Sequence, residues 1–172
     1  MASSLQNLSH YNEENMPSAE ALSFGIVVSE WNQHITHALY EGCRETLIKH
    51  GVKEENIHTL QVPGSFELPL GGKWMADNHK VDAVICLGCV IQGETRHNEY
   101  INQSVSTGLT NLSLFYARPF IFGLLTPNDE QQALDRAGGK HGNKGVEAAT
   151  TAIRMAALKK GFKAQKQNIG FQ

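Results

Sequence analysis

The 172-residue chain lacks an excess of charge of either sign. Lysine and arginine together number 15, and aspartate and glutamate 17, so the formal net charge is −2. This near-neutral balance offers no basic surface for nucleic acid or for an anionic membrane, and neither is expected as a partner. No apolar run approaches the roughly 20 residues that span a bilayer. Residues 1–20 lack the basic start and apolar centre of a secretory signal, so we expect a cytoplasmic protein.

Cysteine is scarce. Cys43, Cys86 and Cys89 form an odd set in a chain without an export signal, which argues against a disulfide framework. Cys86 and Cys89 are spaced as C-x-x-C, but a thioredoxin-type motif sits at a helix start and a structural zinc site needs a second ligand pair. Both residues lie in or at the end of an apolar run, and no second pair exists. The sequence therefore predicts ordinary buried cysteines.

Signatures of several enzyme classes are also missing. The chain has no pattern typical of a Ser-His-Asp triad, no cluster of metal ligands and no G-x-G-x-x-G, which excludes hydrolase, metalloenzyme and dehydrogenase readings. The stretch RAGGKHGNKG at residues 136–145 holds four glycines among basic residues, but not in the order of a Walker A loop. Two interpretations of this stretch stay open. Its backbone lies close to a ligand or to a subunit interface, or the stretch is a solvated hinge. The guanidinium of Arg136 can donate two parallel hydrogen bonds to a phosphate.

Apolar strands alternating with amphipathic helices fill most of the chain. The patterns predict strands at residues 23–29, 56–62, 81–91 and 119–125, and helices at 35–50, 66–78, 99–116, 129–137 and 146–160. Because each strand is almost wholly apolar, an α/β fold with a parallel sheet covered on both faces is expected. Residues 1–20 are polar and aperiodic, so they are expected to form a flexible or extended arm. One domain at residues 21–160 and a tail at 161–172 complete the prediction.

Polar side chains follow all four predicted strands. They occur at residues 30–32, 63–67, 93–97 and 126–129. Right-handed crossovers place the carboxyl ends of parallel strands at one edge of the sheet, where ligands of such folds bind. The sequence therefore predicts an enzyme or a small-molecule binder with its site at this edge.

The segment from Gly93 to His97 carries the most specific chemistry at that edge. We expect Gly93 to take a conformation forbidden to side chains, with the following N–H groups and the Thr95 hydroxyl facing an anion. His97 exchanges protons near neutral pH, although a lone histidine is commonly a surface or capping residue. Trp31 suits stacking on a planar heterocycle or filling space at a rim. Residues 65–67 suit a polyhydroxylated ligand, or a helix start with Ser65 as its cap.

Taken together, these motifs resemble those of the lumazine synthase family of riboflavin biosynthesis. The segments FGIVVSEWN, PGSFELP, GCVIQGETRH, FIFGLLT and DRAGGKHGNKGVEAA occur in family order and spacing between about residues 24 and 158. The resemblance implies a three-layer α/β/α, flavodoxin-like fold with a four-stranded parallel sheet in the order 2-1-3-4. It implies condensation of 5-amino-6-(D-ribitylamino)uracil with 3,4-dihydroxy-2-butanone 4-phosphate to 6,7-dimethyl-8-ribityllumazine, phosphate and water. No cofactor or metal is implied.

The same resemblance assigns residues to the organic part of the substrates: Trp31, Asn32, Ser65, Phe66, Glu67, Cys89, Val90, Ile91, Phe122 and Lys144. Trp31 is implied to stack on the pyrimidine, and the backbone of residues 89–91 to meet its edge. Residues 65–67 are implied to bind the ribityl chain. Phe122 and Lys144 are implied to reach the site from an adjacent subunit.

For the phosphate, the resemblance implies a loop containing Glu94 and Thr95, with Arg136 arriving from the adjacent subunit. His97 matches the proposed proton-transfer residue, and catalysis would be mostly orientation of two reactive substrates. Glu94 departs from the small residue that many members have there. Its backbone rather than its side chain is therefore expected to serve the phosphate.

A site shared between subunits implies self-association. The family forms pentamers and, in many members, an icosahedral shell, and riboflavin synthase is a further candidate partner. Residues 1–20 would then add a strand to a neighbour's sheet. Residues 139–141 lie in a connector linked to assembly state, so pentamer, decamer and shell stay open. Two alternatives also stay open: a flavin-binding electron carrier of flavodoxin-like architecture, and a non-catalytic binding or cage-forming protein.

Overall fold

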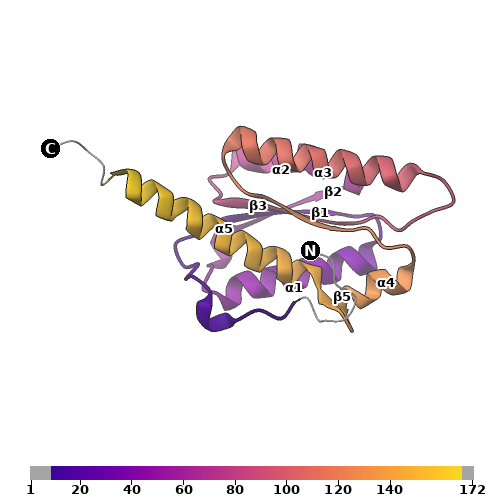
Figure 1. The fold of residues 1–172 in the computed structure, drawn as a ribbon, viewed down its shortest axis with the longest axis horizontal. Coiled ribbons are helices and arrows are strands. Elements are labelled where there is room, and N and C mark those ends of the chain that lie inside the picture. Colours follow the sequence, from indigo (N-terminus) through magenta and orange to yellow (C-terminus); the bar gives the residue numbers. More distant parts are fainter. Residues whose placement is uncertain (1–8, 168–172) are drawn as a thin grey trace.

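The computed structural model describes residues 9–167, which fold around one parallel sheet (Figure 1). Its strands are β1 (Phe24–Ser29), β2 (Ile57–Val62), β3 (Ala83–Cys89) and β4 (Phe120–Leu125). All three pairings are parallel, and the order is β2-β1-β3-β4. The expected α/β class and sheet order are therefore confirmed. Strands β1 and β3 are buried at every position, which explains their uninterrupted apolar sequences.

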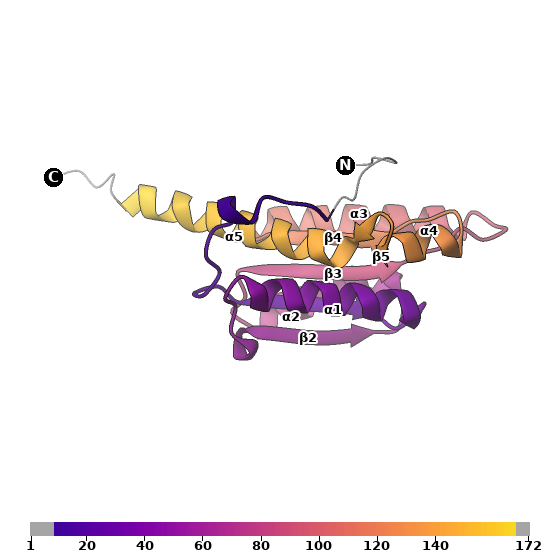
Figure 2. The same cartoon turned by 90° about the horizontal axis from the view of Figure 1, so that it is seen from below.

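Helices cover both faces of the sheet. The principal ones are α1 (Gln33–Lys49), α2 (Leu68–Asn78), α3 (His97–Tyr116), α4 (Glu130–Asp135) and α5 (Lys144–Gln167). Helices α2 and α3 lie on one face, and α1 and α5 lie on the other, as Figures 1 and 2 show. Alternate strand residues therefore enter two separate apolar clusters. Ile85 and Leu87 pack toward α1 and α5, whereas Val84 and Cys86 pack toward α2 and α3.

Helix α1 ends where the sequence predicts. Gly51 follows it with φ of 91°, a left-handed conformation that glycine adopts without the steric cost of a side chain. Its N–H donates to the carbonyl of Ile48 at 2.9 Å and closes the last turn. Asp129 likewise caps α4, because its carboxylate accepts from the N–H of Gln132 at 2.8 Å.

Other boundaries differ from the sequence prediction. Strand β3 ends at Cys89, so residues 90 and 91 belong to the loop that follows it. Helix α3 begins at His97, two residues earlier than expected. The glycine-rich connector forms a hairpin of β5 (Ala137–Gly139) and β6 (Gly142–Asn143), which no periodicity indicated. Three short 3₁₀ turns, at Glu13–Asn15, Glu54–Asn56 and Ser65–Glu67, were also not predicted.

Residues 9–20 of the expected arm lie against their own chain. The Ser9 hydroxyl donates to the carbonyl of Asn143 at 3.0 Å, and the Tyr11 hydroxyl lies 2.9 Å from Nε2 of His50. Glu13 pairs with Lys49 at the end of α1. Figure 2 shows this segment running past α5. Residues 1–8 and 168–172 of the predicted arm and tail lie outside the described part.

Candidate active site

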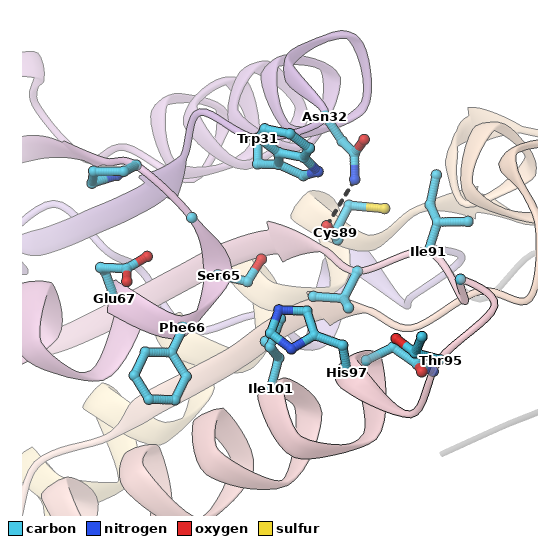
Figure 3. Close-up of a pocket in the computed structure, with 15 residues that line it drawn as sticks. Trp31, Asn32, Ser65, Phe66, Glu67, Cys89, Ile91, Thr95, His97 and Ile101 are labelled. Atoms are coloured by element: carbon cyan, nitrogen blue, oxygen red, sulfur yellow. Dashed lines mark hydrogen bonds between the residues drawn. The ribbon is translucent and has the colours of Figure 1, made fainter.

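A cavity of about 770 Å³ lies at the carboxyl edge of the sheet. The loops that follow β1, β2 and β3, together with the first turns of α3, supply its walls (Figure 3). The sequence predicted a site at this edge, and three of the four polar segments contribute to it. The lining residues are Trp31, Asn32, Pro63, Gly64, Ser65, Phe66, Glu67, Cys89, Val90, Ile91, Gly93, Thr95, His97, Asn98 and Ile101.

The first wall of the cavity is the loop after β1, and Asn32 connects this loop by a hydrogen bond to β3 in the sheet. Its backbone is left-handed, with φ of 60° and ψ of 47°, and its side-chain amide donates to the carbonyl of Cys89 at 3.0 Å. The preceding N–H, on Trp31, donates to the carbonyl of Pro63 at 3.1 Å. These bonds tie the loops after β1, β2 and β3 to one another. They hold the Trp31 ring at the rim, where 72% of the residue is exposed.

The second wall is the 3₁₀ turn of residues 65–67. Gly64, not Ser65, occupies the capping position before this turn, so the alternative of Ser65 as a helix cap is wrong. Ser65 is buried, and its hydroxyl lies 3.5 Å from that of Ser29 below the cavity. Phe66 is more than half exposed. This wall therefore combines an open aromatic ring with the carboxylate of Glu67 and the hydroxyl of Ser65, as Figure 3 shows.

The third wall runs from Gly93 into helix α3. The φ of Gly93 lies outside the left-handed region, and a Cβ there would meet only open space, so our reason for expecting glycine is wrong. Thr95 and His97 line the cavity and are exposed to solvent. His97 is the first residue of α3 rather than part of the loop. The first N–H groups of a helix have no partner within it, and together with the helix dipole they favour an anion.

Cys89 contributes main chain and not a reactive thiol. Its carbonyl accepts the Asn32 amide, while its side chain belongs to the apolar cluster under α1 and α5. Burial raises the pKa of the Cys89 thiol to about 12 and that of Cys86 to about 12. The prediction of buried cysteines at this C-x-x-C is confirmed. No group of three or more metal-ligating side chains occurs among the described residues.

Four predicted site residues do not line the cavity: Glu94, Phe122, Arg136 and Lys144. Glu94 is exposed in the loop between two lining residues. Phe122 is 38% exposed on β4, although every other residue of that strand is buried. Arg136 and Lys144 flank the β5–β6 hairpin, and both pair with Glu147 of α5. Phe122, Arg136 and Lys144 therefore lie outside the cavity of their own chain.

Five lining residues received no individual role from the motifs: Pro63, Gly64, Gly93, Asn98 and Ile101. The first three lie in segments 63–67 and 93–97, which the sequence predicted at this edge. Helical spacing offered a signal for one of the other two, since Ile101 follows His97 by four positions and shares its helix face. Asn98 had no such signal, because the predicted helix began only at residue 99.

No helix of the described residues is both long and apolar enough to cross a membrane.

Comparison with known proteins matches residues 21–160 to the model of the 6,7-dimethyl-8-ribityllumazine synthase family. The chain belongs to this family. Lumazine synthases of Cytophaga hutchinsonii and Parabacteroides distasonis are 56% and 55% identical to it. Those alignments cover 91% and 90% of this chain, and 98% and 97% of the relatives. The lumazine synthase of Flavobacterium psychrophilum is 48% identical over 99% of this chain and 88% of its own length. The resemblance drawn from the motifs to lumazine synthases is therefore confirmed.

Proposed function

We propose that the cavity at the carboxyl edge is the site of lumazine formation. The observation that carries this proposal is the convergence of three loops on one cavity, with an exposed tryptophan on one side and a helix N-terminus bearing a histidine on the other. An aromatic heterocycle and a phosphate ester are the two chemical features that such walls recognise. The two substrates implied by the family carry one of these features each.

The pyrimidine binds against Trp31 in this proposal. The indole ring lies at the rim beside Asn32, and residues 90 and 91 line the same space. The ribityl chain extends along residues 65–67, where Glu67 and Ser65 provide oxygen atoms for its hydroxyl groups. The phosphate of the second substrate lies at Thr95 and the first N–H groups of α3. Glu94 serves this phosphate through its backbone, since its exposed carboxylate would repel it.

The reaction then needs orientation more than activation. The uracil amine attacks the ketone and an imine forms with loss of water, phosphate leaves, and ring closure with a second dehydration completes the lumazine. Holding both substrates in one cavity makes the first step effectively intramolecular. His97 projects from the first turn of α3 between the two binding regions and transfers protons in these steps.

The cavity of one chain is completed by another chain. Phe122, Arg136 and Lys144 lie outside their own cavity, and large apolar residues remain exposed on α3 and α5, including Leu114, Phe115, Leu158 and Phe162. Such surfaces are typical of subunit interfaces. We therefore infer self-association, with pentamers or a larger shell as the expected assemblies and riboflavin synthase as a candidate partner. Arg136 of one subunit then holds the phosphate bound to its neighbour.

A fluorescence assay tests the proposal directly. Purified protein is mixed with both substrates, and lumazine formation is followed beside the His97→Ala and Arg136→Ala variants. We expect a rate well above the uncatalysed background. Loss of His97 should reduce it by about 100-fold at most, near the low end of acid–base catalysis, because the substrates already react without a protein. Loss of Arg136 should mainly raise KM for the phosphate-bearing substrate.

The matched control is His37→Ala, which removes an exposed histidine on α1 outside the cavity and should keep the wild-type rate. A wild-type rate equal to the background would contradict the proposal. Quenching of tryptophan fluorescence by added flavin, compared between the wild type and Trp31→Phe, would then test the alternative of a flavin-binding protein.

A further inference from the structure

The N-terminal strap (residues 9–16) bonds to the open edge of the β5–β6 hairpin. The Ser9 hydroxyl donates to the carbonyl of Asn143 at 3.0 Å and accepts from the N–H of the same residue. Asn143 pairs with Ala137 of β5, but because its own N–H and carbonyl bond to Ser9, they face away from that strand. One hydroxyl therefore satisfies two main-chain groups that a third strand would otherwise have to satisfy.

The other end of the strap is anchored on helix α1. The Tyr11 hydroxyl lies 2.9 Å from Nε2 of His50, and the centroids of the two rings are 5.6 Å apart. Glu13 pairs with Lys49, and Met16 packs against the apolar cluster under α1 and α5. The strap thus connects the end of α1 to the hairpin, and Figure 2 shows it passing α5 on the way. This anchoring limits where Ser9 can lie.

The strap bonds to the hairpin directly beside the two cations Arg136 and Lys144. Lys144 follows Asn143 in sequence, and its N–H donates to the carbonyl of Arg136 at 2.9 Å across the hairpin. A displacement of Asn143 therefore moves the backbone of both cations. The hairpin has only two short strands, and such an element is marginally stable without further contacts. The side chain of Asn143 supplies one such contact, to the carbonyl of Ala38 on α1, and the strap supplies another.

We propose that the N-terminal strap is a positioning segment, which holds the β5–β6 hairpin of its own chain so that Arg136 and Lys144 meet the cavity of the neighbouring subunit. This inference rests on the proposed function, which gives those two residues their ligands. No residue of the strap lines the cavity of its own chain. The strap acts by raising the fraction of time that the hairpin is in place, and the apparent affinity for the phosphate-bearing substrate is proportional to that fraction.

A strand exchanged between subunits is the competing arrangement. The family pattern implies that residues 1–20 add a strand to a neighbour's sheet, whereas Ser9, Tyr11 and Glu13 bond to their own chain in this structure. In the exchanged arrangement Ser9 leaves Asn143, and removal of its hydroxyl has no effect on the hairpin. The rate of amide hydrogen exchange in the hairpin therefore separates the two arrangements.

The test measures hydrogen exchange of residues 136–145 by mass spectrometry in the wild-type assembly and in Ser9→Ala. We expect exchange of this segment to become about tenfold faster in the variant, the effect of losing one to two neutral hydrogen bonds. Ser9→Thr keeps the hydroxyl and should restore the wild-type rate of exchange. KM for the phosphate-bearing substrate should rise about twofold in Ser9→Ala, because the hairpin is in place for less of the time. Its kcat and its KM for the pyrimidine substrate should stay at wild-type values.

Ser18→Ala is the matched control. Ser18 is exposed near the same end of the chain, and its hydroxyl accepts from the N–H of Glu20 rather than bonding to the hairpin. Both the exchange rate and KM should stay at wild-type values in this variant.

Unchanged exchange in Ser9→Ala would overturn the inference, as would an equal increase in Ser18→Ala or faster exchange without a rise in KM. Wild-type protein without condensation activity would refute the proposed function instead, and the exchange rates would still decide whether the strap holds the hairpin.

Discussion

Asn32 shows how one residue connects the backbone to the site. Its left-handed conformation turns the chain from β1 into α1, and its side chain reaches the carbonyl that ends β3. Asparagine tolerates this conformation better than other side chains, and glycine tolerates it best. The same residue thus carries a conformational role and a hydrogen bond, and two substitutions can separate them.

We predict that Asn32→Gly costs about 1 kcal/mol of unfolding free energy, because only the hydrogen bond is lost. Asn32→Ala should cost about 1–2 kcal/mol more, because alanine also resists the left-handed conformation. Urea unfolding of both variants measures the difference. Ala117, at the end of α3, has φ of 43°, so Ala117→Gly should be neutral or stabilising. Equal losses for the two Asn32 variants would show that the turn imposes no strain.

At the scale of elements, the contact between α1 and α5 determines where the β5–β6 hairpin and its cations lie. Helix α5 presents small residues to the sheet and to α1, including Ala148, Ala149 and Ala152, all buried. The closest approach is at Gly145, where a Cβ would lie 1.8 Å from the carbonyl oxygen of Leu39. Asn143 adds a hydrogen bond of 2.8 Å from its amide to the carbonyl of Ala38. The start of α5 is therefore packed directly on the backbone of α1.

Gly145→Ala should consequently lower the free energy of unfolding by about 1–3 kcal/mol, the usual cost of overpacking, because the two helix backbones must separate. Gly161→Ala provides the control in the same helix, since a Cβ there meets nothing within 4 Å. That variant should be stabilised by up to about 1 kcal/mol through helix propensity. Thermal and urea unfolding report both values. A Gly145→Ala protein as stable as the wild type would mean that α5 moves freely over α1.

The elements differ in how far the sequence could predict them. The strands are located to within two residues at each end. Strands β1, β3 and β4 are almost wholly apolar, whereas β2 is an edge strand of mixed sequence, IHTLQV, with one buried residue. The start of α3 was predicted two residues too late. No side chain caps the helix at Arg96, so the sequence carries no signal for its first residue. The β5–β6 hairpin is glycine-rich and short, and it depends on positive φ at Gly138 and Gly142 rather than on any alternation of apolar residues. Hydrophobic patterns therefore located the elements that form the core and missed those shaped by backbone conformation.

At the scale of the whole molecule, the two edges of the sheet carry different chemistry. The cavity occupies the carboxyl edge, whereas His58, near the start of β2, stacks on His79 at the end of α2, with ring centroids 4.2 Å apart. Burial, and then the charge of His79, lowers the pKa of His58 below its usual value of 6.5. The unfolded chain therefore binds this proton at a higher pH than the folded chain does.

We predict that this difference contributes to a loss of stability on acidification. As the pH falls through 6.5 toward the lower folded pKa, the unfolded state gains protons first, and the free energy of unfolding decreases. Unfolding in urea at pH 7.5 and 5.5 should show a smaller decrease for both His58→Phe and His58→Gln than for the wild type. The two variants differ in packing but share the loss of titration. An unchanged decrease in both would show that His58 makes no contribution.

The sequence predicted the residues of the candidate site better than the contacts between them. Ten of the fourteen predicted site residues line the cavity, because strand ends collect at one edge and the motifs locate them. The sequence could not show that Asn32 bonds to the Cys89 carbonyl, or that Glu147 joins Arg136 to Lys144. Those contacts depend on side chains that are distant in sequence and on a hairpin without periodicity. The roles that the family pattern assigns to individual residues remain predictions.

The orientation of Cys89 has a consequence for chemoselectivity. A ketone that condenses with an amine is an electrophile, and a thiolate beside it would compete by forming a hemithioketal. Cys89 is among the residues that line the cavity, and its carbonyl accepts the Asn32 amide, while its side chain belongs to the apolar core and burial raises the pKa of its thiol to about 12. Thiolate is the nucleophilic form, and almost none is present at neutral pH. If the proposed site is correct, the Cys89 thiol therefore does not compete with the amine for the ketone.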